Sequence, residues 1–92
     1  MTDRKVTARK LADMVVMRAA CYSNYEIAEK MGVSVSTIEY HFSKMKRRAG
    51  EIGAHMAVLE VLIGAGPDYM LFRFSPFKVT PEEVVKELEK EG

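Results

Sequence analysis

The residues with the clearest chemical potential lie between Ser34 and Gly50, where hydrogen-bonding and cationic side chains are concentrated. Polar and aromatic residues recur there at spacings of three and four. In a helix this spacing puts them on one exposed side, which would carry Ser36, Glu39, Tyr40 and Ser43. A basic run overlaps the end of this stretch and consists of Lys44, Lys46, Arg47 and Arg48. The first set can hydrogen-bond with base edges, and the cations can hold phosphates. The pattern predicts a helix that binds nucleic acid.

Other kinds of site are poorly represented in the sequence. A metal site needs several converging ligands, and the chain offers one cysteine, Cys21, and two scattered histidines, His41 and His55. Glu82 and Glu83 stand at a predicted helix start, where they complement the helix dipole rather than form an acid–base pair. We therefore expect no enzyme activity, no metal and no cofactor, and we expect Cys21 to be a small buried side chain.

Local signals predict the two helices that carry the candidate residues. Ser23 and Glu26 have the spacing of a capping box, which opens a short helix, and Gly32 suits a left-handed residue at its end. Ser34 can cap a second helix, expected from about Val35 to Arg48, and residues 51–53 after Gly50 should form a short connector. The buried face of this second helix should contain Ile38, Phe42 and Met45. Two helices joined by a glycine-containing turn, with the second one exposed, are the parts of a helix-turn-helix.

Two further helices are expected around this pair. Thr7 can cap a first helix running to about Ala20, with Arg18 on its surface and a core face made of Leu11, Met14, Val15 and Ala19. A fourth helix near residues 55–65 is apolar almost all the way round. A helix of that kind is buried on all sides, so in a chain this short we expect a second copy to cover it. The predicted interface residues are Met56, Leu59, Leu62 and Ile63.

The C-terminal part predicts a strand and a last helix. Residues 68–74 alternate in polarity, with Met70, Phe72 and Phe74 on one side, as in a strand. The strand could pair with residues 77–79 in a hairpin or with its own copy across a dimer axis. We favour pairing with the second copy, which adds Met70, Phe72 and Phe74 to the predicted dimer interface. Thr80-Pro81 with Glu83 marks the start of a last helix.

The expected fold is therefore mainly α. Residues 1–65 would form a four-helix helix-turn-helix domain that includes the dimerising fourth helix. Residues 66–92 would form a C-terminal extension of a strand, or short hairpin, and a final helix, with a role in oligomerisation.

Size and charge agree with a nucleic-acid-binding domain. A chain of 92 residues with 48% hydrophobic and 29% charged residues suits one folded domain. Residues 1–50 hold ten lysines and arginines against five acids, whereas residues 51–92 hold four against eight. The basic half contains the candidate helix, which favours a nucleic-acid face at one end. One cysteine, with no signal peptide or membrane span in the sequence, predicts a cytoplasmic protein.

The order of parts from Val6 to about Leu62 resembles the LuxR/GerE type of four-helix helix-turn-helix domain. The matching segments are Val6–Arg9, Ser23–Ala28, Gly32–Phe42, the basic run up to Gly50, and Ala57-Val58. Sigma-factor region four shares much of this pattern.

The resemblance implies specific roles along the second helix of the motif. It implies base-edge contacts by Val35, Ser36, Glu39, Tyr40 and Ser43. It implies phosphate contacts by Arg9, Ser34, Thr37, His41, Lys44, Lys46, Arg47 and Arg48. Lysine is common in the family at the position of Glu39. A carboxylate can accept a hydrogen bond from cytosine N4 but repels phosphate, so the family's base preference does not transfer.

The sequence thus predicts a homodimeric, sequence-specific double-stranded DNA-binding protein, most simply a transcriptional regulator. RNA polymerase is a further candidate partner, and no membrane association is expected. Two alternatives stay open. One is a viral or plasmid DNA-packaging or partition adaptor, similar to a terminase small subunit, which would form a larger ring. The other is a protein-interaction module that never touches DNA.

Overall fold

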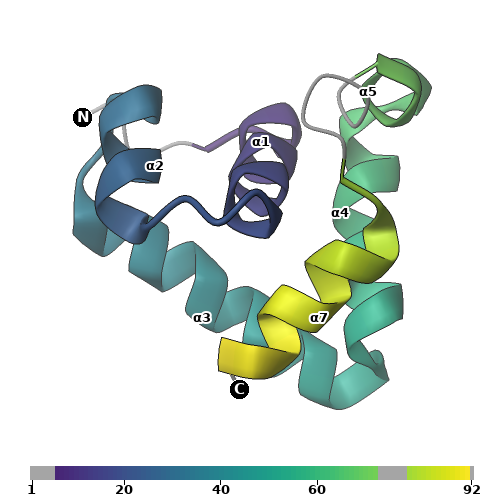
Figure 1. Cartoon of the computed structure of the whole chain (residues 1–92). Coiled ribbons are helices and arrows are strands. Elements are labelled where there is room, and N and C mark those ends of the chain that lie inside the picture. Colours follow the sequence, from purple (N-terminus) through teal and green to yellow (C-terminus); the bar gives the residue numbers. More distant parts are fainter. Residues whose placement is uncertain (1–5, 73–78, 92) are drawn as a thin grey trace.

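Helices make up almost all of the chain that the computed structural model describes, namely residues 6–72 and 79–91 (Figure 1). In this part the order is α1 (Ala8–Ala19), α2 (Asn24–Met31), α3 (Val35–Ile52), α4 (Ala54–Ala65), α5 (Pro67–Phe72) and α7 (Pro81–Glu91), and it contains no strand. The prediction of a mainly α fold is confirmed. None of these helices is long and apolar enough to cross a lipid bilayer.

α1 is the central helix, and it contacts α2, α4 and α7 (Figure 1). Thr7 caps it as predicted, because its side-chain oxygen accepts a hydrogen bond from the Lys10 backbone N–H at 3.2 Å. The helix buries more than the predicted face, since the fully or nearly fully buried residues are Ala12, Met14, Val15, Val16 and Met17. The burial is wider because α4 and α7 cover sides that α2 and α3 leave open.

The link between α1 and α2 differs from its prediction at two residues. Cys21 has a left-handed backbone, with φ +72°, and an exposed side chain, so the expected burial is wrong. Arg18, expected on the surface, is mostly buried instead. Its guanidinium donates to the Tyr22 carbonyl at 3.3 Å and to Asn24 Oδ1 at 3.4 Å, and it lies 5.7 Å from the Phe42 ring centroid. Arg18 therefore ties the end of α1 to the start of α2 and to the buried side of α3.

The turn between α2 and α3 forms as its residue types predict. Ser23 and Glu26 make both hydrogen bonds of a capping box, at 2.8 and 3.1 Å. Gly32 ends α2 with φ +71°, a conformation that a side chain disfavours. Ser34 caps α3 by accepting from the Thr37 backbone N–H at 3.1 Å. This local chemistry fixes where α3 begins.

α3 is longer than predicted and runs directly up to α4. The expected connector after Gly50 is wrong for Glu51 and Ile52, which continue the helix. α3 ends at Gly53, whose φ of +93° breaks the helical path, and α4 begins at the next residue. One glycine thus separates two helices that pack against each other.

Residues 67–72 form the short helix α5 where a strand was expected. The start is favourable for a helix, because Pro67 needs no backbone N–H in the first turn and Asp68 complements the dipole there. Tyr69 is buried, and its hydroxyl donates to Asp13 Oδ1 at 3.1 Å, which anchors α5 on α1. The strand prediction is wrong for this segment, including Met70 and Phe72, whereas Phe74 and the predicted hairpin at 77–78 lie outside the described residues.

α7 packs on α4 and α1 and completes the core. Thr80 and Glu83 make the predicted reciprocal cap, at 3.1 and 3.3 Å. Val79, Val84 and Leu88 join the same hydrophobic cluster as the buried residues of α1 to α4. Val79 and α7 therefore share one hydrophobic cluster with α1 to α4.

The Tyr69–Asp13 hydrogen bond supports a stability prediction. We expect Tyr69→Phe to lower the free energy of unfolding by about 1 to 2 kcal/mol, because a buried hydroxyl loses its bond to a charged acceptor. Urea unfolding of the two proteins measures the difference. Tyr25→Phe is the control, since Tyr25 is exposed and should change stability very little. Equal effects of the two substitutions would show that the buried bond contributes nothing.

Candidate nucleic-acid interface

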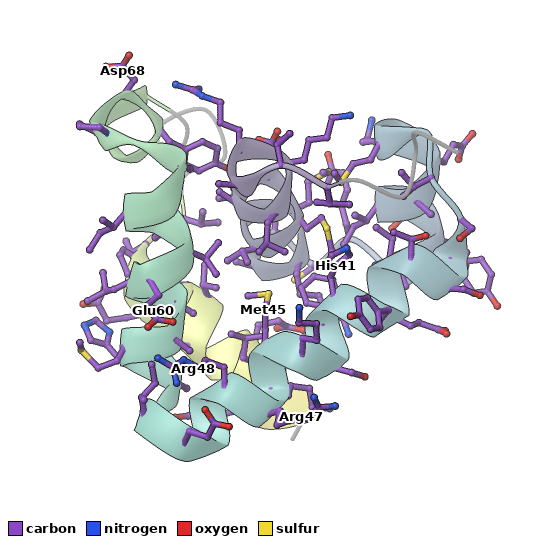
Figure 2. All side chains as sticks on the ribbon, turned by 180° about the vertical axis from the view of Figure 1, so that it is seen from behind. His41, Met45, Arg47, Arg48, Glu60 and Asp68 are labelled. Carbon is purple, nitrogen blue, oxygen red and sulfur yellow. The ribbon has the colours of Figure 1, made fainter. Side chains whose placement is uncertain are left out.

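The candidate face of α3 is open to solvent. Its exposed residues are Ser36, Glu39, Tyr40, Ser43, Lys44 and Arg47, and the Tyr40 side chain is 58% exposed. The opposite face packs into the core through Ile38, Phe42 and Met45. Figure 2 shows Met45 directed toward α1 and Arg47 directed away from it. A helix buried on one side and polar on the other leaves that polar side available to a partner.

Tyr40 is the largest side chain on this face, and its neighbours restrict it. The His41 ring meets it edge-on, with centroids 5.2 Å apart and planes at 73°. The Lys44 ammonium lies 5.5 Å from the Tyr40 centroid, within the range of a cation–π contact. The arrangement holds an aromatic ring and a hydroxyl outward beside a cation, which suits contact with a base and an adjacent phosphate.

His41 differs in charge from the cations around it. Partial burial lowers its pKa below the ordinary histidine value, and the nearby Lys44 charge lowers it further. Both effects favour the uncharged imidazole in the free protein. An uncharged imidazole can still donate a hydrogen bond to a phosphate oxygen.

Arg48 is not a free cation, contrary to the expectation for the basic run. Its guanidinium binds Glu60 on α4 through two hydrogen bonds of 2.7 and 3.1 Å, and Glu51 at 2.9 Å (Figure 2). The Glu60 bonds contribute most to raising the pKa of Arg48, and the same pairing lowers the pKa of Glu60. Two carboxylates thus satisfy the charge that was expected to hold a phosphate. The extension of α3 to Ile52 makes this possible, because it carries Glu51 and leads directly into α4.

Four other residues with predicted DNA contacts lie at the start of α3. Ser34 and Thr37 bond to each other through their side chains at 2.9 Å as part of the helix cap. Val35 is half-buried and packs against the core, so the predicted base contact has little free surface. Ser36 is exposed at the same end.

The remaining predicted cations occupy two places. Arg9 is exposed in the first turn of α1. Near it, Val6 and Leu11 line a hollow of about 360 Å³ together with His41 and Lys44 of α3. Lys46 is half-buried and lines a smaller hollow with Asn24, Glu39 and Ser43.

Within residues 6–72 and 79–91, no three histidine, cysteine, aspartate or glutamate side chains are placed to hold a metal ion.

Leu62 is fully buried inside its own subunit, so its predicted place in a dimer interface is wrong. Met56 and Ile63 are 53% and 67% exposed, and Leu59 is half-buried.

Comparison of the chain with models of protein families, with curated proteins and with solved structures found no match.

Proposed function

We propose that this chain is a sequence-specific double-stranded DNA-binding protein that inserts α3 into the major groove and acts as a transcriptional regulator. The observation that carries the proposal is the solvent-exposed α3 face with Glu39, Tyr40 and Ser43 at its centre and Lys44 and Arg47 beside them. The major groove is wide enough for one helix, and side chains on such a face reach base edges there.

The surrounding elements support a helix-turn-helix of the LuxR/GerE type. α2 is short and capped at both ends, Gly32 provides the tight turn, and α3 packs one face on α1 and α2. In a helix-turn-helix the second helix enters the groove while the first lies across the backbone. The arrangement leaves the α3 face free for that role.

The contrast between Arg47 and Arg48 provides a matched test. We expect Arg47→Ala to weaken binding to all DNA sequences by about three- to tenfold and to reduce the salt slope by about one per lost phosphate contact. Arg48→Ala should change the salt slope much less, because Glu51 and Glu60 already pair with that guanidinium. Fluorescence anisotropy with a labelled duplex at several salt concentrations measures both. A larger slope change for Arg48 would contradict the assignment.

We further propose that α4 contributes to a homodimer. α7 covers one side of α4, and the other side retains the exposed Met56 and Ile63 with the half-buried Leu59 between them. These three residues are spaced three and four apart and so lie along one helix face. Two copies would then read half-sites with centres about 34 Å apart, or a multiple of that distance.

We expect Ile63→Glu to weaken dimerisation at least tenfold, because a carboxylate in an apolar contact loses its water without a partner. Sedimentation equilibrium across a concentration series measures the effect. Tyr25→Glu is the matched control, since it places the same charge at an exposed aromatic position on α2. If the Ile63 variant dimerises as tightly as the wild type, the exposed side of α4 is not part of the dimer interface. A ring larger than a dimer would favour the packaging or partition function instead.

A further inference from the structure

Glu39 is an acidic residue on the exposed face of α3, which also carries Lys44 and Arg47. Its side chain is exposed, and it lies one helical turn before Ser43 and two turns before Lys46. It lines a hollow of about 170 Å³ with Asn24, Ser43 and Lys46, where α2 begins beside α3. A partner placed against the polar face of α3 would therefore meet this carboxylate.

No folding role accounts for Glu39. Other glutamates of this domain stabilise caps or ion pairs, namely Glu26, Glu51, Glu60, Glu83 and Glu87. By contrast, no hydrogen bond or ion pair links Glu39 to any other described residue. It is also the fifth residue of α3, beyond the first turn where an acid complements the dipole. The carboxylate is left free for a partner.

We propose that Glu39 determines the sequence preference of α3 by requiring a cytosine at the base pair it faces. This inference rests on the proposed DNA-binding function and deepens it. A carboxylate only accepts hydrogen bonds, and the major groove offers mostly acceptors, namely guanine N7 and O6, adenine N7 and thymine O4. Only the amino groups of cytosine and adenine can donate to it. Adenine places its N7 acceptor beside that amino group, which repels a carboxylate, so cytosine is the better partner.

The same charge acts against all other sequences. Without an amino donor, Glu39 enters the groove desolvated and close to phosphates of the same sign, which costs free energy. The cations on α3 attract any duplex, whereas Glu39 makes an unsuitable duplex less favourable. Specificity gained by repulsion in this way does not require stronger binding to the correct site.

The test compares the full-length protein with its Glu39→Gln and Glu82→Gln variants. Glu82 is exposed on α7, so its substitution makes the same charge change away from α3. Each protein selects sites from a random duplex pool, and the affinity of each for unselected duplex is measured at 100 mM salt. Circular dichroism melting checks that all three are equally folded.

We expect the wild type and Glu82→Gln to select sites with one position held as cytosine, preferred at least tenfold. In Glu39→Gln that preference should be lost or move to adenine, whose N6 and N7 match an amide. Its affinity for unselected duplex should rise about threefold or more, because one repulsive charge is gone. If Glu39→Gln selects the same site as the wild type with the same non-specific affinity, Glu39 is not a determinant, although DNA binding stands. If the wild type itself binds no duplex, the DNA-binding proposal and this inference both fail.

Discussion

Raising the salt concentration from 50 to 200 mM is expected to lower the affinity of this protein for its DNA site by about a thousandfold. The reason is counterion release, because each phosphate neutralised by a side chain frees a condensed cation from the duplex. Three phosphate contacts per copy, or about six per dimer, correspond to a loss of that size. The exposed cations that can make these contacts are Lys44, Arg47 and Arg9.

Anisotropy titrations of one labelled duplex across this range measure the slope of log affinity against log salt, expected near −5 for six contacts. Circular dichroism at each salt concentration is the control, because it separates weaker binding from unfolding. Flat affinity between 50 and 200 mM would exclude a phosphate-binding role for α3 and would favour the protein-interaction alternative.

The second large effect is expected in the core, where Leu62→Ala should lower the free energy of unfolding by about 3 kcal/mol. Leu62 has no exposed surface and lies on the inner side of α4, in the hydrophobic cluster that the described helices share. Its truncation removes buried methyl groups and leaves a cavity that the surrounding helices fill only in part. A domain of this length is stable by about 5 to 14 kcal/mol, so the loss is a large share of the total.

Ile63→Ala is the natural control, because the next residue along α4 is 67% exposed. It should change unfolding of the isolated subunit by about 0.5 kcal/mol or less. Urea denaturation at a concentration below dimer formation compares the two. Similar losses for both variants would mean that Ile63 is covered in the solution structure and that the outer side of α4 is not free.

Local sequence chemistry predicted the helix starts well. Thr7, Ser23, Ser34 and Thr80 each cap the helix that follows, and each cap depends on residues no more than three positions away. The exposure of Glu39, Tyr40 and Ser43 was also predictable, because helical periodicity places them opposite Ile38, Phe42 and Met45.

Long-range contacts account for what the sequence did not predict. The alternation in residues 68–74 fits a strand, yet residues 67–72 form the helix α5. Tyr69 of this helix donates a hydrogen bond to Asp13, 56 residues earlier in the chain. Similarly, Arg48 is part of a basic run in the sequence, but in the structure α4 places Glu60, 12 residues later, beside it. Periodicity and caps contain no information about such partners, so α5, the Arg48 pairing and the place of α7 needed the structure.

The near-continuous joining of α3 to α4 has a mechanical consequence. α3 and α4 meet at an angle, with one glycine of positive φ between them and the Arg48–Glu60 ion pair joining them (Figure 1). If copies meet through α4, the distance between their α3 helices is then set by the packing of α3 against α4 and not by a linker. Adding or removing a few base pairs between the half-sites should therefore prevent the two α3 helices of a dimer from binding both half-sites at once.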